Sequence, residues 1–276
     1  MTAVPLARRV AAVRLGGRST LALAVVSAVG VVAFGWPLLA PRLAVGGGLG
    51  HTRDAPWLFV LLLPMLLAVV LAEIADGGME AKAVAMLGVL TACGAALRPL
   101  GGGFTGVTPV FFLLLLGGRV LGRGFGFVLG ALTLFASALL TGGVGPWLPF
   151  QMLGAAWVGF FAGCLPPAGG RAELWLLAAY GVVAGLGYGL LLNLWFWPFG
   201  AGTPVGSGLA FDPAAGLVVN LGHFLAFDLA TSLGFDVPRA ITNLLLVLIA
   251  GRPVLAALRR AARRAAFDAP VSFEPG

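Results

Sequence analysis

Long apolar runs, with almost no alternation of polar and apolar residues, dominate the chain. A helix that crosses the hydrocarbon core of a bilayer needs about 20 mainly apolar residues. Eight runs approach or reach that length and predict spanning helices at residues 19–40, 57–74, 81–97, 104–121, 125–141, 146–165, 174–199 and 237–258. A further apolar stretch, 214–234, contains His223 and Asp228. We predict that it is a re-entrant or surface-lying helix at the outer interface, where solvent reaches both side chains.

The composition agrees with this pattern. Hydrophobic residues make up 60% of the chain and charged residues only 10%, against roughly a quarter charged in soluble domains. Too little polar surface remains to cover a soluble globule, which excludes a soluble enzyme, a disordered chain and a secreted disulfide scaffold. Strands of porin-type barrels alternate polar and apolar residues, and these runs do not. The predicted fold class is therefore an all-α polytopic membrane protein.

The chain has a net charge of +7, and the positions of its basic residues indicate how it is oriented in the membrane. If 214–234 does not cross, the chain has eight spans and both termini are cytoplasmic. The cytoplasmic side then holds thirteen basic residues and the outside four, as the positive-inside rule requires. The outer four are Arg42, Arg53, Arg98 and Arg239, and the inner set is Arg8, Arg9, Arg14, Arg18, Lys82, Arg119, Arg123, Arg171, Arg252, Arg259, Arg260, Arg263 and Arg264. This distribution indicates contact with anionic lipids and leaves no need for a nucleic-acid partner.

Small residues recur at four-residue spacing in several predicted spans, which lets helix backbones approach closely. We expect ordinary internal packing to explain most of these stripes, including Gly126 with Gly130 and Gly159 with Gly163. The stripe in the 81–97 span is the best candidate for a partner-docking face, because small residues continue along its whole length. Its residues are Ala81, Ala85, Gly88 and Ala92.

Two predicted outer loops and one helix end place polar groups close to the hydrocarbon core. Burying a polar group there costs free energy, so these residues are candidates for a functional role. The glycine-rich loop after Arg98 precedes an apolar run too short to cross alone, so we expect the loop to dip into the membrane. The 145–151 loop is stiffened by two prolines. An aromatic-lined pocket with few polar groups suits an organic ligand. The predicted substrate-binding residues are Arg98, Thr105, Thr108, Trp147, Gln151, Asn193 and Trp195. The alternative for the tryptophans is an interfacial aromatic belt.

Several catalytic and nucleotide-binding motifs are absent from the sequence. It has no Gly-x-x-x-x-Gly-Lys-[Ser/Thr], no HExxH and no paired acidic metal motif within the spans. We therefore expect no catalytic residue, no bound metal and no cofactor. A self-sufficient secondary transporter stays open as an alternative, although it would need an internal repeat and a midplane ionisable site. An intramembrane enzyme acting on lipid or peptide also stays open, with Ser207 and His223 as its candidates, although Ser207 lies in an extramembrane loop.

The segment 81–165 resembles the core of the substrate-binding S component of an energy-coupling-factor (ECF) transporter. The likeness covers about two thirds of the chain and rests on patterns of glycine, proline and aromatic residues. These are the small-residue helix ending in Arg98, the glycine-rich loop, Gly117-Gly118-Arg119-Val-Leu-Gly122, Gly145-Pro-Trp-x-Pro-Phe-Gln151 and a closing segment, Asp236-Val-Pro-Arg239, that is similar to actinobacterial members.

The resemblance implies a six-helix core with both ends cytoplasmic, here preceded by two additional helices. It divides the chain into an N-terminal leader with two helices (1–80), a substrate-binding core (81–258) and a basic tail (259–276). It also implies a transmembrane T component that docks on the small-residue stripe, and two cytoplasmic ATPase subunits. The implied substrate is a vitamin or related micronutrient taken up from outside. Cobalamin is favoured, and riboflavin or a queuosine precursor stays open.

Overall fold

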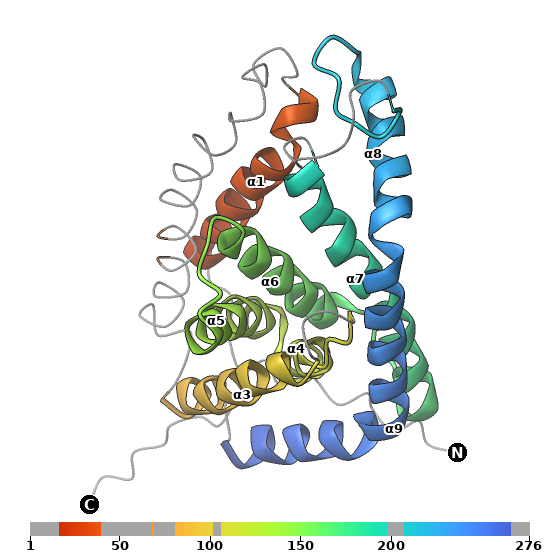
Figure 1. Cartoon of the computed structure of the whole chain (residues 1–276). Coiled ribbons are helices and arrows are strands. Elements are labelled where there is room, and N and C mark those ends of the chain that lie inside the picture. The colour runs from red at the N-terminus through yellow and green to blue at the C-terminus, as the bar shows by residue number, and fades with distance from the viewer. Residues whose placement is uncertain are drawn as a thin grey trace, which may run out of the picture.

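The chain folds into helices throughout the part that the computed structural model describes, which comprises residues 17–39, 64, 68, 81–101, 106–197 and 207–265. These residues form eight helices and no strand (Figure 1). The helices are α1 (Gly17–Leu39), α3 (Ala81–Leu100), α4 (Val110–Leu121), α5 (Arg123–Thr141), α6 (Leu148–Cys164), α7 (Gly170–Phe196), α8 (Leu217–Thr231) and α9 (Leu233–Ala265). The predicted 57–74 span, apart from two positions, and the end of the tail lie outside the described residues.

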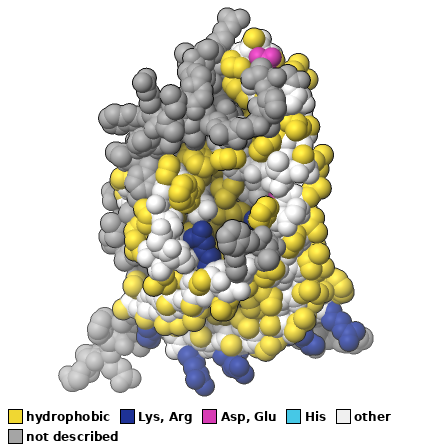
Figure 2. Space-filling view, viewed as in Figure 1, with side chains coloured by type: hydrophobic (Ala, Val, Ile, Leu, Met, Phe, Trp, Pro, Cys, Tyr) yellow, Lys and Arg dark blue, Asp and Glu magenta, His cyan; other side chains and the backbone are white. Residues whose placement is uncertain are grey.

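Four of these helices, α3, α5, α7 and α9, are long and apolar enough to cross a membrane. Helices α1, α6 and α8 contain shorter apolar segments. The face seen in Figure 2 is largely hydrophobic, and Lys and Arg side chains project from its lower edge. The all-helical, membrane-embedded class expected from the composition therefore agrees with the structure.

Helix α4 is shorter than the run that predicts it. The apolar run begins at residue 104, whereas the helix begins at Val110, directly after Pro109. Proline restricts the residue before it to extended conformations, so the helix cannot start earlier without a kink. Its 12 residues give a length of about 18 Å, well short of the roughly 30 Å hydrocarbon core. Helix α4 therefore does not cross the membrane alone.

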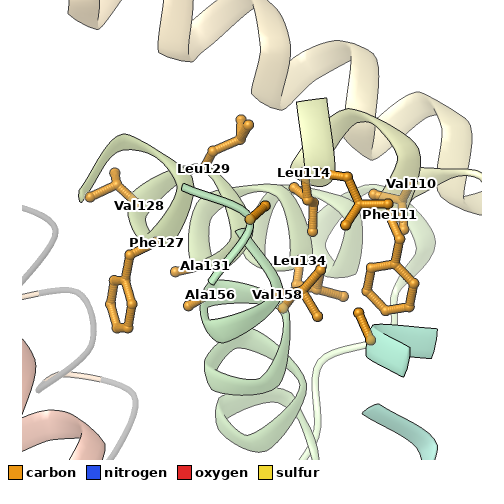
Figure 3. Close-up of a cluster of buried hydrophobic side chains, with 14 of the residues drawn as sticks. Val110, Phe111, Leu114, Phe127, Val128, Leu129, Ala131, Leu134, Ala156 and Val158 are labelled. Atoms are coloured by element: carbon orange, nitrogen blue, oxygen red, sulfur yellow. The ribbon is translucent and has the colours of Figure 1, made fainter. Parts of the chain in front are cut away.

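Helices α4, α5 and α6 form the centre of the fold, and glycines set their close approach. A Cβ on Gly159 would lie 2.1 Å from the carbonyl oxygen of Gly126, and one on Gly126 would lie 2.2 Å from that of Gly159. Gly130 meets the backbone of Ala155 in the same way. Figure 3 shows the buried side chains that these three helices contribute to the core. The sequence expectation that these glycine stripes serve internal packing is confirmed.

Helix α1 belongs to this core. The Phe34 ring meets Phe150 edge-on, with 5.0 Å between centroids, and the Trp157 indole N–H donates to Ser27 Oγ at 3.0 Å. A buried indole N–H requires such a partner. Helix α1 therefore packs on α6 and also contacts α7 and α8.

Helix α9 changes direction within its 33 residues. Figure 1 shows its first part standing beside α7 and its last part running across the lower end of the molecule. Pro253 lies inside the helix, and proline removes a backbone hydrogen bond and bends a helix. Beyond the proline, Leu255, Leu258 and Ala262 are buried while the arginines are exposed. This last part is an amphipathic segment that closes the base of the bundle.

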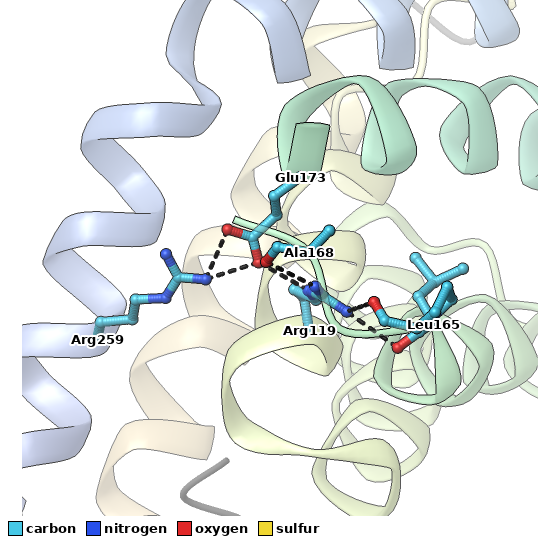
Figure 4. A network of polar contacts seen from close by, with 6 residues as sticks. Arg119, Leu165, Ala168, Glu173 and Arg259 are labelled. Atoms are coloured by element: carbon cyan, nitrogen blue, oxygen red, sulfur yellow. Dashed lines mark hydrogen bonds and ion pairs between the residues drawn. The ribbon is translucent and has the colours of Figure 1, made fainter. Parts of the chain in front are cut away.

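Basic residues from distant parts of the sequence meet at this lower end. Lys82 Nζ donates to the carbonyl oxygen of Ala265 at 3.1 Å. Glu173 accepts from Arg119 Nε at 2.8 Å and from Arg259 Nη2 at 2.6 Å (Figure 4). We call this region the basic end; it contains Lys82, Arg119, Arg171, Arg252, Arg259, Arg260, Arg263 and Arg264. Eight of the thirteen basic residues that the charge pattern assigns to the cytoplasmic side therefore share one end of the structure.

Candidate functional site

The central contact of the candidate site joins two of the predicted substrate-binding residues. Arg98 lies in the last turn of α3, and its Nη2 donates to Gln151 Oε1 at 2.8 Å. Gln151 lies in the first turn of α6, after Trp147 at the N-cap and a proline in the opening positions. The Arg98 Nη1 atom is buried and has no hydrogen-bond partner among the described residues. Buried polar atoms are usually paired, so this guanidinium has unused donor capacity.

The two predicted tryptophans occupy different positions. Trp195 is only 9% exposed and lies against Phe150, with 5.1 Å between ring centroids and a tilt of 33°. Trp147 is 42% exposed, and its indole N–H donates to the carbonyl oxygen of Gly143 at 3.2 Å. Trp195 therefore belongs to the interior beside the Gln151 turn, whereas Trp147 lies one turn earlier on α6, at the rim.

A second arginine reaches the same interior from α9. The Arg239 guanidinium carbon lies 5.3 Å from the centroid of the Tyr188 ring, and Arg239 Nη1 donates to Asp236 Oδ1 at 2.6 Å. Arg239 and Arg98 both act electrostatically on buried Tyr188. Arg239 Nε is also buried without a hydrogen-bond partner in the described part of the chain. Tyr188 on α7 thus lies against the guanidinium of Arg239 and within electrostatic range of that of Arg98.

Tyr188, Arg239 and Asp236 are absent from the set of site residues predicted from the sequence. A signal was available, because Asp236 and Arg239 stand three residues apart and can pair on one helix face. Tyr188 is one of only two tyrosines in the chain, although nothing in the sequence places it beside an arginine. We call Arg98, Gln151, Tyr188, Asp236 and Arg239 the buried polar cluster.

Asn193 lies apart from Arg98 and serves another contact. Its Nδ2 donates to Asp228 Oδ1 at 2.9 Å and also contacts Ser232 Oγ, which ties α7 to α8 and to the start of α9. Asp228 is only 9% exposed, so the expectation that solvent reaches it is wrong. The apolar sequence around it gave no sign that an amide from α7 would supply its partner.

The glycine-rich loop turns back onto α9. Gly106 has a φ of +70°, and a Cβ there would lie 2.2 Å from the carbonyl oxygen of Phe235, so only glycine fits this contact. Thr108 Oγ1 donates to the carbonyl oxygen of Gly106 at 2.9 Å and closes the turn. Thr105 lies outside the described residues. The described end of the loop therefore lies against the beginning of α9, near the buried polar cluster.

The predicted partner-docking residues share an open face of α3. Ala81, Ala85, Gly88 and Ala92 are all exposed, and nothing lies within 4 Å of a Cβ built on Gly88. The opposite face, with Ala83, Leu87, Gly94 and Ala95, is buried against the bundle. The stripe is therefore left uncovered by the described part of the chain.

Ser207 and His223 make separate local contacts. Ser207 Oγ accepts from the backbone N–H of Leu209 at 3.3 Å, and His223 Nδ1 lies 2.9 Å from the carbonyl oxygen of Ala210. In the described chain no hydrogen bond joins the two side chains. This arrangement lacks the serine–histidine contact on which nucleophilic catalysis depends.

Comparison of the chain with known protein families, with curated proteins and with solved structures gives no match.

Proposed function

We propose that the chain is the substrate-binding S component of an ECF-type importer and captures a vitamin or related micronutrient from outside. The observation that carries the proposal is the buried polar cluster, in which Arg98 Nη1 and Arg239 Nε are buried and have no hydrogen-bond partner among the described residues. Donors left without partners inside an apolar bundle are costly. A ligand with anionic or carbonyl groups would satisfy them. Cobalamin is the favoured substrate on the sequence resemblance.

Each predicted site residue has a role in this proposal. Arg98 meets an anionic or carbonyl group of the substrate, and Gln151 holds Arg98 in place while offering its amide N–H groups. Trp195 forms an aromatic wall, and Trp147 stacks on the substrate at the rim. Asn193, on α7, supports the site by holding α8 in place, since its amide N–H groups are already used by Asp228 and Ser232. Arg239, which lies over the Tyr188 ring, supplies further N–H donors to the substrate.

The experiment that tests the proposal compares variants of the chain with the wild-type protein, by their substrate affinity and by vitamin uptake into cells that carry the full transporter. We expect Arg98→Met to weaken substrate binding roughly 10- to 150-fold, because a hydrogen bond to a charged group contributes about 1.5–3 kcal/mol. Trp147→Ala should also reduce uptake strongly. The matched control is Trp175→Ala, which removes an exposed tryptophan near the basic end. Membrane insertion should be unchanged in all three variants, and unchanged substrate affinity in both site variants would refute the assignment.

The partners follow from the same proposal. The chain contains no P-loop, so ATP hydrolysis would come from two cytoplasmic ATPase subunits, coupled through a transmembrane T component. The α3 stripe, which the described part of the chain leaves uncovered, supports a docking face for that T component, because small residues let a partner helix approach closely. In this arrangement the basic end faces the cytoplasm with both termini, and the eight-span topology places the buried polar cluster toward the outer side.

Gly88→Leu tests the docking face. We expect it to block recovery of the complex with the T component while leaving the fold intact, because no described residue lies within 4 Å of the new Cβ. The control is Gly187→Leu on α7, where no described residue lies within 4 Å of a built Cβ either and which lies outside the stripe. The measurement is co-purification of the T component with each tagged variant. Equal recovery with both variants would contradict this role for the stripe.

One observation favours a second candidate, an ion-coupled secondary transporter. The sequence gives no midplane ionisable site, yet Asp228 and Asp236 are 9% and 4% exposed within apolar helices. Buried carboxylates in such helices commonly mark proton or ion pathways. Uptake into vesicles distinguishes the two functions. Dependence on ATP and the ATPase subunits supports an S component, whereas uptake driven by an ion gradient without them supports the second candidate.

A further inference from the structure

A pocket of about 390 Å³ lies at the basic end, between the first turn of α7 and the bend of α9. Its volume falls within the range of roughly 300–1,000 Å³ that ligand pockets have. Four arginines and one glutamate contribute all its side-chain charge. The lining residues are Gly170, Glu173, Leu174, Arg252, Leu255, Ala256, Arg259, Arg260 and Arg263.

The one carboxylate in this pocket is already used. Glu173 accepts from Arg119 Nε at 2.8 Å and from Arg259 Nη2 through both of its oxygens, at 2.6 and 2.7 Å (Figure 4). Arg119 also donates to the carbonyl oxygens of Leu165 and Pro166. Two arginines therefore balance one glutamate, and the Glu173 network keeps a net positive charge before the other arginines are considered.

Three arginines of the pocket remain without an acidic partner. Within the described residues no ion pair joins Arg252, Arg260 or Arg263 to a carboxylate. All three nevertheless line the same pocket, Arg252 just before the bend at Pro253 and Arg260 and Arg263 after it. The N-terminus of α7 also opens here at Gly170 and contributes the positive end of a helix dipole.

We propose that this pocket binds a phosphate group, carried either by an anionic phospholipid headgroup or by a soluble phosphate. Several arginine forks converging in a concave site with a helix N-terminus match the oxygen atoms and charge of a phosphate. The site is separate from the buried polar cluster and does not depend on the proposed transport function.

The surroundings suit a lipid headgroup in particular. Leu174, Leu255 and Ala256 give the pocket an apolar floor beside its arginines, as the junction of a headgroup and its acyl chains requires. Trp175, in the first turns of α7, is 61% exposed, and exposed tryptophans collect at the membrane interface. The position of the pocket beside Trp175 therefore favours a lipid phosphate as its occupant.

The test uses the full chain in nanodiscs and measures the midpoint of thermal unfolding. We expect phosphatidylglycerol, compared with phosphatidylcholine, to raise the midpoint of the wild-type protein by on the order of 5 °C. The double variant Arg260→Gln/Arg263→Gln should lose most of this rise, because both side chains line the pocket and neither touches Glu173. The matched control Arg171→Gln/Arg264→Gln removes the same amount of charge from the basic end but outside the pocket. Its unfolding midpoint should still rise in phosphatidylglycerol.

A second arm adds inorganic phosphate to phosphatidylcholine nanodiscs, with chloride at equal ionic strength as the reference. If only phosphatidylglycerol raises the unfolding midpoint, and the pocket variant loses this rise, the ligand is a lipid headgroup. If inorganic phosphate raises the unfolding midpoint, and the pocket variant loses this rise, the ligand is a soluble phosphate. The proposal is overturned if neither addition raises the midpoint, or if the pocket variant and the control variant respond alike.

Discussion

Replacing Glu173 with Gln is expected to lower the free energy of unfolding by about 3–5 kcal/mol, the usual loss when one partner of a buried ion pair is removed. Arg119 is only 7% exposed and relies on Glu173 for its sole carboxylate among the described residues. Glutamine keeps the shape of the side chain but cannot balance the buried guanidinium. Reversible unfolding in mixed micelles, followed by circular dichroism, measures the change.

Arg259→Gln is the control for this prediction. The Arg259 side chain is 44% exposed, and an exposed ion pair contributes only about 0–1 kcal/mol. Its removal leaves Glu173 paired with Arg119. We therefore expect a much smaller loss in the free energy of unfolding than for Glu173→Gln. Equal losses in the two variants would show that the buried pair does not stabilise the junction of α4 with α7.

Gly159→Leu is expected to prevent stable folding, with a loss of at least about 3 kcal/mol. A Cβ at this position would lie 2.1 Å from the carbonyl oxygen of Gly126. Because the obstacle is backbone in the neighbouring helix, a rotamer change cannot relieve the clash, and α5 and α6 would have to separate. Size-exclusion chromatography of a fluorescent fusion in detergent should show aggregated protein.

The control for the glycine contact is Gly222→Leu in α8, where no atom of the described part of the chain lies within 4 Å of a built Cβ. This variant should elute as the wild-type protein does. A monodisperse Gly159→Leu protein with wild-type thermal stability would mean that α5 and α6 do not pack through this pair of glycines.

Much of the fold follows from local sequence patterns. Apolar runs long enough to span a bilayer predicted α5, α6 and α7 close to their observed limits, because a buried helix in lipid needs a continuous apolar surface. Glycine spacing predicted close internal packing of helices, and the structure shows it between α5 and α6. The charge pattern placed Arg119, Arg259 and Lys82 on one side, and the structure gathers them at one end.

The remaining features depend on contacts between distant segments. Arg98 and Gln151 could be chosen as costly polar groups near hydrocarbon, but their direct contact could not be deduced from positions 53 residues apart. Tyr188 joins the cluster only because α9 carries Arg239 across its ring. The late start of α4 had a local signal in Pro109, whereas the pairing of Asn193 with Asp228 had none.

The most direct test of the central claim is mass spectrometry of small molecules that co-purify with the detergent-solubilised full-length protein from cells grown in vitamin-replete medium. The wild-type protein and the Trp175→Ala control are predicted to retain a vitamin-class molecule that Arg98→Met and Trp147→Ala lose. Retention of the same molecule by all four proteins, or a wild-type protein that retains none, would contradict a substrate site at the buried polar cluster.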